Sequence, residues 1–205
     1  MQSEKMVARG EKVMGLGDKK VYILLTDTGT YFTKLIKVYT KRSYNHASIA
    51  FDHELAKVYS FGRKKPRNPF IGGFVVEDIN KGLLKHADCI IYSFTVNHEE
   101  LRKMEQYIAT IESEKEDYRY NLFGLFGVLF NKPLKRRKAF FCSQFVASVI
   151  HATDSIEFEK PLSLITPYDL RNIPSIQVEY EGKLNEYLDR DTAPSESEGS
   201  FFVSI

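Results

Sequence analysis

Short apolar runs of strand-forming residues recur through the first half of the chain. The first run, VYILLT at 21–26, predicts a strand, and the spacing of apolar residues then becomes helical over 29–42, which predicts a helix. The runs HASIAF (46–51) and AKVYSF (56–61) are separated only by the polar residues DHEL. These two runs therefore predict an antiparallel hairpin.

Beyond this hairpin, polar breaks alternate with two more apolar runs. The segment GRKKPRNP (62–69) is basic and interrupted by proline, which predicts a loop. GFVVEDI (73–79) and DCIIYSFTV (88–96) are rich in β-branched and aromatic residues. Both runs predict further strands.

The second half of the chain changes to helical spacing. Asn97 and Glu100 have the spacing of a capping box, and the apolar residues after them predict a helix over 98–113. The run YNLFGLFGVLF (120–130) is apolar on nearly all sides and predicts a buried helix or a pair of helices. NKPLKRRK (131–138) predicts an exposed loop.

A further helix is predicted from Cys142 to about His151. Its inward positions are Phe145, Val146, Val149 and Ile150.

The end of the chain predicts less regular structure. ITPYDLRNIP (165–174) predicts one helical turn between prolines, and SIQVEY (175–180) predicts a last strand. Because strands and helices are mixed and include a hairpin, we expect the α+β class with a mainly antiparallel sheet. The expected organisation is a polar segment 1–19, one domain 20–185, and a flexible tail 186–205 of disordered composition.

Composition supports one reduced, globular domain. The chain has 205 residues, and 43% of them are hydrophobic, which is enough for a sizeable core. Its 29 basic and 27 acidic residues leave a net charge of +2, so the overall charge gives no reason to propose nucleic acid as a partner. No stretch approaches the roughly 20 apolar residues of a membrane span, and residues 1–20 lack the apolar run of a signal peptide. We expect a cytoplasmic protein without stable membrane insertion.

The two cysteines differ in their surroundings. Neither has metal-ligand spacing, and two are too few for a disulfide framework. Cys89 lies inside an apolar strand and is predicted to be a core residue. Cys142 begins a helix, where the helix dipole and unpaired N–H groups favour a thiolate and can lower the pKa of a thiol from about 8.5 toward neutral. Cys142 is therefore the candidate nucleophile.

A cysteine nucleophile needs a base, and His46 is the candidate. Five histidines are present, but His46 opens a strand whose inward positions are Ala47, Ile49 and Phe51. That pattern leaves His46 and Ser48 on the opposite face.

The order of these segments resembles a known family. YILLTDTGTYFTKLIKVYTKRSYNHASIAFD, KVYSF, YRYNLFGLFG, FFCSQFVASVI and ITPYDL follow one another as in the circularly permuted NlpC-type papain-fold cysteine hydrolases, the YiiX and YaeF-like group. The resemblance covers residues 20 to 173. It implies a permuted papain-like fold, with a mainly antiparallel sheet or small barrel packed against helices that include the Cys142 helix.

The resemblance also implies site residues. His46 matches the family base and Cys142 the nucleophile, while Ser60 falls where many members have a glutamate. A hydroxyl orients an imidazole but does not stabilise its cation as a carboxylate does. Three readings stay open: the triad is weaker, a neighbour such as Tyr59 or Glu77 substitutes, or catalysis has been lost.

The remaining expected site groups bind substrate. The backbone N–H of Cys142 would donate to an oxyanion, and the hydroxyl of Tyr44 could add a second hydrogen bond.

Two basic loops are either solvated or bind an anionic substrate group or a phospholipid surface. Arg136 and Arg137 belong to the second loop, which ends four residues before Cys142. The first contains Arg63, Lys64, Lys65 and Arg67, and the second also contains Lys132, Lys135 and Lys138.

The activity implied by the resemblance is acyl transfer through a Cys-His thioester mechanism. The leading substrates are amides, such as a small peptide, a cell-wall fragment or an N-acyl compound. Two alternatives stay open: an acyltransferase or esterase on lipid or ester substrates, and a catalytically silent binding module of the same fold. The family chemistry needs no metal or cofactor.

Overall fold

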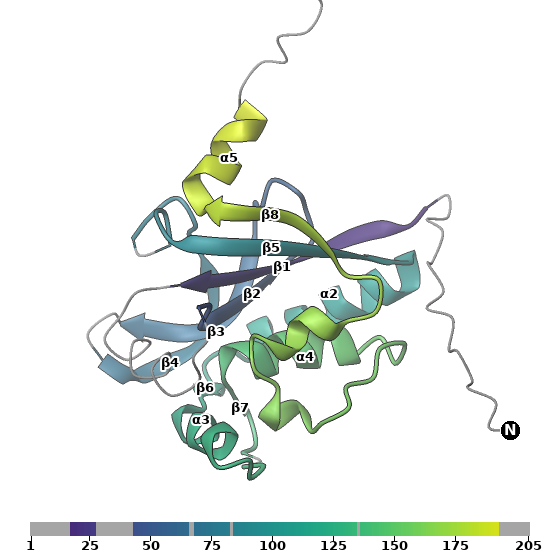
Figure 1. Ribbon diagram of the computed structural model, residues 1–205. Helices are drawn as coiled ribbons and strands as arrows, with labels where there is room; N and C mark the ends of the chain where they lie inside the picture. The colour runs from purple at the N-terminus through teal and green to yellow at the C-terminus, as the bar shows by residue number, and fades with distance from the viewer. Residues whose placement is uncertain (1–16, 28–42, 66–67, 83, 135, 193–205) are drawn as a thin grey trace, which may run out of the picture.

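A six-stranded antiparallel sheet forms the centre of the protein (Figure 1). The computed structural model describes residues 17–27, 43–65, 68–82, 84–134 and 136–192. The strand order is β4-β3-β2-β1-β5-β8, and each neighbouring pair is antiparallel. The strands are β1 (Lys19–Asp27), β2 (His46–Ala50), β3 (Val58–Lys65), β4 (Asn68–Glu77), β5 (Asp88–Val96) and β8 (Gln177–Lys183).

Helices lie mainly against one face of this sheet (Figure 1). The α-helices are α2 (His98–Ser113), α3 (Leu122–Leu129), α4 (Cys142–His151) and α5 (Leu184–Thr192). Two 3₁₀ turns, η1 (Leu162–Leu164) and η2 (Asp169–Asn172), follow α4. The short strands β6 (Arg119–Tyr120) and β7 (Ala139–Phe140) pair in parallel on either side of α3. The helix predicted at 29–42 lies outside the described residues.

The central strand β1 is buried on both faces, which explains its unbroken apolar sequence. Val21, Ile23 and Leu25 join the larger core cluster with α2 and α4. Tyr22 and Leu24 join a smaller cluster on the other face with Cys89 and α5. Because water reaches neither face, apolar residues are favoured at both parities of the strand.

Helix α4 is the most deeply buried helix, because every residue from Cys142 to Ile150 is buried. The Phe145 ring packs on Phe61 of β3, with ring centroids 5.1 Å apart, and on Phe74 of β4 at 5.9 Å. The predicted inward face of this helix is confirmed, and the packing fixes the helix across β2 and β3.

The predicted α+β class and the antiparallel sheet are confirmed, whereas a small barrel is wrong. Within the described part of the chain the sheet is open, with β4 and β8 as its edges. The loop predicted at 62–69 is also wrong in extent, because β3 continues to Lys65 and β4 begins at Asn68. A Cβ at Gly72 would lie 2.5 Å from the Gly62 carbonyl oxygen, so glycine at this position permits the two strands to approach closely.

Two other expectations need correction. Helix α3 was expected to be buried, but the side chain of Phe123 is 59% exposed, and Phe130 just beyond the helix is 70% exposed. Residues 186–192 were placed in a flexible tail, yet they complete α5. This helix is held to the sheet because Leu184 and Tyr187 are buried in the smaller core cluster.

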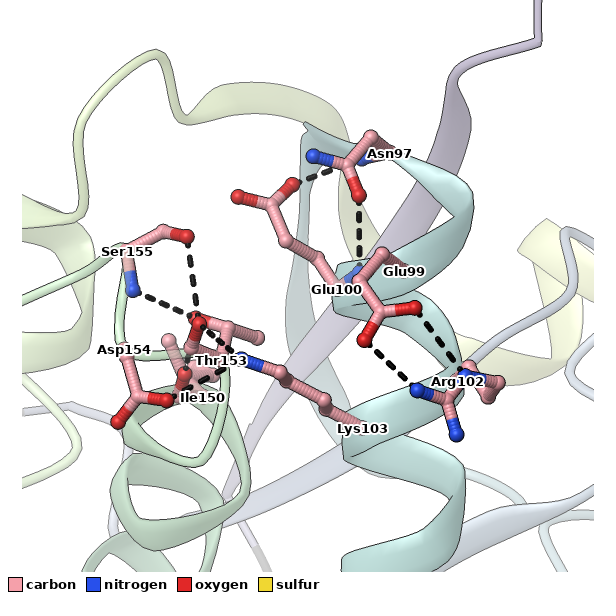
Figure 2. A network of polar contacts seen from close by, with 9 residues as sticks. All are labelled: Asn97, Glu99, Glu100, Arg102, Lys103, Ile150, Thr153, Asp154 and Ser155. Atoms are coloured by element: carbon pink, nitrogen blue, oxygen red, sulfur yellow. Dashed lines mark hydrogen bonds and ion pairs between the residues drawn. The ribbon is translucent and has the colours of Figure 1, made fainter.

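Helix α2 begins with the predicted capping box, which Figure 2 shows in detail. The Asn97 side chain accepts a hydrogen bond from the Glu100 N–H at 2.9 Å, and the Glu100 carboxylate accepts one from the Asn97 N–H at 2.7 Å. From the same helix, Lys103 reaches the Asp154 carboxylate at 3.1 Å and so ties α2 to the turn after α4 (Figure 2). The cap therefore supports the layer of helices that holds α4.

We expect Asn97→Ala to lower the free energy of unfolding by about 1 kcal/mol, because one N–H of the first helical turn loses its partner. Urea unfolding followed by circular dichroism measures this change. Asn97→Ser is the matched control and should keep most of the stability, because serine also caps helices. Equal losses in both variants would show that the capping hydrogen bond contributes nothing.

Candidate active site

The first residue of β2, the last residue of β4 and the first residue of α4 carry the candidate site. They are His46, Glu77 and Cys142. His46 contacts Glu77 directly, and the nearby Cys142 thiol contributes to the raised pKa of His46. Segments nearly 100 residues apart in the sequence thus meet through the packing of α4 on the sheet.

A short contact joins His46 to Glu77. The His46 Nε2 atom lies 2.6 Å from the Glu77 Oε1 atom, and the two side chains are 13% and 11% exposed. The other carboxylate oxygen, Oε2, accepts a hydrogen bond from the Ser48 hydroxyl at 2.5 Å. Both carboxylate oxygens are therefore occupied, and the imidazole ring is fixed through one nitrogen.

Ser60 lies beside this pair but does not replace the carboxylate. Its hydroxyl donates to the Ala47 carbonyl oxygen at 2.8 Å, while its distance from His46 Nε2 is 3.4 Å. Since the hydroxyl proton is used by Ala47, Ser60 can act on the imidazole only as a distant acceptor. Of the three open readings of the sequence, the geometry favours substitution by Glu77.

Cys142 occupies the first position of α4 and is 4% exposed. The preceding residue, Phe141, caps the helix with extended backbone but no side-chain hydrogen bond. The first intrahelical hydrogen bond runs from the Phe145 N–H to the Phe141 carbonyl. The backbone N–H groups that precede Phe145 in the helix, starting with that of Cys142, make no intrahelical hydrogen bond. They project from the helix end, where a thiolate or an oxyanion is favoured.

The electrostatics of the pair favour a protonated imidazole. Burial alone lowers the pKa of His46, but the charge and hydrogen bond of the Glu77 carboxylate, together with the nearby Cys142 thiol, outweigh burial. The pKa of His46 therefore lies well above its ordinary value of 6.5. An imidazolium next to a thiol stabilises the thiolate.

Cys89 has the opposite environment, as predicted for a core residue. It is fully buried in β5, and burial together with the neighbouring Asp88 charge raises the pKa of its thiol to about 12. Cys89 is therefore unreactive at neutral pH.

The other predicted substrate-binding residues lie apart from the His46–Cys142 pair. The Tyr44 hydroxyl donates to Glu181 of β8 at 2.8 Å, and β8 is separated from β2 by β1 and β5. Arg136 lies over the ring of Phe123, with its Cζ atom 5.7 Å from the centroid, and Arg137 is exposed. Among the described residues, no hydrogen bond or ion pair joins these three side chains to the pair.

The sequence analysis missed two polar groups next to the site. The Ser48 hydroxyl holds Glu77, and the β2 alternation that placed it on the face of His46 was the available signal. Gln144 lies two residues after Cys142, and its buried Oε1 atom has no hydrogen-bond partner among the described residues. Buried polar atoms without a hydrogen-bond partner are rare in folded proteins, so the Gln144 Oε1 atom is a candidate for contact with a substrate or water.

One hollow of the described surface lies at the other end of β2, beside the turn of the hairpin. Its volume is about 580 Å³. Its lining consists of Phe51, Asp52, Glu54, Ala56, Lys57, Tyr59 and Glu105. Because β2 runs away from His46 toward this turn, the hollow does not coincide with the thiol.

No group of three or more His, Cys, Asp or Glu side chains in the described part of the chain could hold a metal ion. No helix in the described ranges is long and apolar enough to cross a membrane.

Comparisons with protein family models, curated proteins and solved structures give no significant match to this chain.

We expect the Glu77 carboxylate to stabilise the fold in a pH-dependent manner. The folded-state pKa of His46 is raised, so its protonation contributes stability that is fully present below pH 6.5 and is lost as pH rises through the folded-state pKa. Glu77→Gln should cost on the order of 3 kcal/mol at mildly acidic pH, because it leaves a buried cation unpaired. The loss should shrink at alkaline pH, and urea unfolding across pH measures it.

Ser60→Ala is the control for this prediction. It removes a neighbouring hydroxyl without removing the charge partner of His46, so its stability loss should not vary with pH. A pH-independent loss in Glu77→Gln would contradict the ion pair.

Proposed function

We propose that this protein is a cysteine-dependent hydrolase of amide bonds with a permuted papain-like fold. The observation that carries the proposal is the position of His46, which contacts the Glu77 carboxylate at 2.6 Å and lies near enough to the Cys142 thiol for the thiol to raise its pKa. A nucleophile, a base and a group that orients the base are the minimum set for covalent acyl transfer.

In the proposed reaction His46 carries the proton of the Cys142 thiol before the substrate binds, and the resulting thiolate attacks the carbonyl carbon of the amide. The carbonyl oxygen becomes an oxyanion, which the backbone N–H of Cys142 stabilises at the start of α4. His46 then returns the proton to the departing amine, leaving a thioester. Water, deprotonated by His46, attacks the thioester, and release of the acid restores the thiol.

Glu77 has a distinct role in this scheme. Its contact through Nε2 leaves the other ring nitrogen, Nδ1, to exchange a proton with the thiol. Its charge also stabilises the imidazolium, which a serine hydroxyl cannot do. The carboxylate at this position is the main argument for an enzyme over a silent binding module.

The substrate is argued from chemistry and from the family resemblance. Amides of a small peptide, a cell-wall fragment or an N-acyl compound are the leading candidates. The same thioester would also form from an ester or a lipid acyl group, so acyl transfer on such substrates is the second candidate. The exposed apolar side chains of α3 favour that second candidate, since they lie on the segment that leads into Cys142.

We expect Cys142 to react with iodoacetamide at neutral pH and Cys89 to remain unreactive in the folded protein. His46→Ala should reduce the alkylation rate of Cys142 at neutral pH by about tenfold or more, because the thiolate loses its cation. Mass spectrometry of the cysteine peptides gives both rates across pH. If His46→Ala leaves the Cys142 profile unchanged, the proposed enzyme has no activated nucleophile.

A second comparison identifies the group that orients His46. We expect Glu77→Gln to shift the alkylation profile of Cys142 toward that of an ordinary thiol, whereas Ser60→Ala should change the rate by less than about threefold, since its hydroxyl makes only a long contact. The measurement is the same peptide-resolved alkylation across pH. The reverse order of effects would assign the orienting role to Ser60.

A further inference from the structure

Three large apolar side chains project from one small region next to β7. Phe123 lies on α3, Phe130 just beyond it, and Leu134 in the connection to β7, with exposed fractions of 59%, 70% and 43%. They make up half of the six large apolar side chains that are exposed in the described structure. Isolated exposed apolar residues are ordinary, but a group of this kind in one region indicates an interaction surface.

These side chains belong to one surface because the connection folds back on the helix. Positions 123, 127 and 130 share one helical face. The Lys132 N–H donates to the Gly127 carbonyl at 2.8 Å, and a Cβ at Gly127 would lie 3.2 Å from Leu134 Cγ. Glycine at this position lets Leu134 pack directly on the helix.

Positive charge surrounds these apolar side chains. Arg136 lies over the Phe123 ring, and Lys132 and Arg137 are exposed nearby in the sequence. No Asp or Glu occurs between residues 118 and 153. Lys138 is already neutralised by Glu114 and Asp117, but no ion pair within the described ranges involves Lys132, Arg136 or Arg137. We call the set Phe123, Phe130, Leu134, Lys132, Arg136 and Arg137 the α3 patch.

We propose that the α3 patch docks on the surface of an anionic lipid membrane. Aromatic and aliphatic side chains that project singly enter the boundary between headgroups and acyl chains, while neighbouring Lys and Arg side chains bind anionic headgroups. The complete lack of acidic residues over 118–153 matches a surface of one charge sign. Docking would be peripheral and would require no membrane-spanning helix.

The position of the patch gives docking a consequence for the rest of the protein. Helix α3 lies at the periphery, on the opposite side of the molecule from β8 and α5 (Figure 1). The connection that carries Leu134 and Arg136 leads through β7 to Cys142. Docking would hold the start of α4 near the lipid surface. This proposal goes beyond the proposed hydrolase and does not depend on it.

Cosedimentation of the full chain with vesicles tests the proposal. We expect binding to phosphatidylcholine vesicles that contain phosphatidylserine, weaker binding to phosphatidylcholine alone, and a loss of binding as salt is raised. The double variant Arg136→Glu and Arg137→Glu should weaken binding by about 25-fold or more, because each cation near the membrane contributes about fivefold. The double variant Phe123→Ser and Phe130→Ser should weaken it by about tenfold or more.

Two control variants match these changes. Lys57→Glu with Lys85→Glu makes the same change in charge at exposed positions of other loops, and Val178→Ser removes an exposed apolar side chain from β8. Both controls should bind as the unaltered chain does. Cys142→Ala should also bind normally, and the patch variants should keep the Cys142 alkylation profile, so docking and catalysis succeed or fail separately.

Two results would overturn the proposal. One is the absence of binding by the unaltered chain, or binding that the patch variants and the controls share equally. The other is a dimer in light scattering without lipid that Phe123→Ser with Phe130→Ser converts to a monomer, which would assign the patch to a second copy of this chain.

Discussion

The burial of α4 against β2, β3 and β4 is the constraint on which the candidate site depends. A helix of ten residues without a side-chain N-cap is marginal by itself, so packing must hold it in place. Phe145 supplies that packing through Phe61 and Phe74, which lie on β3 and β4. Since β4 also carries Glu77, the same contacts that bury the helix set the position of Cys142 relative to its partners.

The polar cluster on this sheet is costly to bury and is arranged to reduce that cost. A carboxylate and an imidazole taken out of water lose hydration, and only a close partner and filled hydrogen-bonding positions compensate for that loss. Glu77 has His46 on one oxygen and Ser48 on the other, while Ser60 is satisfied by a backbone carbonyl. Such a cluster fixes one orientation of the imidazole, and covalent catalysis requires a fixed orientation.

Helix α3 departs from the rule that governs the rest of the chain. In the described core the apolar residues are buried, and exposed positions of α2 carry charged side chains that pair with one another, such as Glu99 and Arg102. At α3 the side chains of Phe123 and Phe130 are exposed, and the segment 118–153 carries no acidic residue. A local exception of this kind in an otherwise consistent sequence is expected at a functional surface rather than at a structural one.

The sequence determined several of the local elements and the two main candidate residues of the site. Strand β5 and helix α2 begin and end at the predicted residues, because β-branched runs and a capping box are local signals. It also singled out His46 and Cys142 from their places at the starts of a strand and a helix. Tertiary structure decided the choice between Ser60 and Glu77 and the exposure of α3. Both depend on how distant segments pack. The Glu77 side chain reaches His46 and Ser48 from β4, across β3, and the periodicity of an all-apolar helix does not show which side, if any, meets the core.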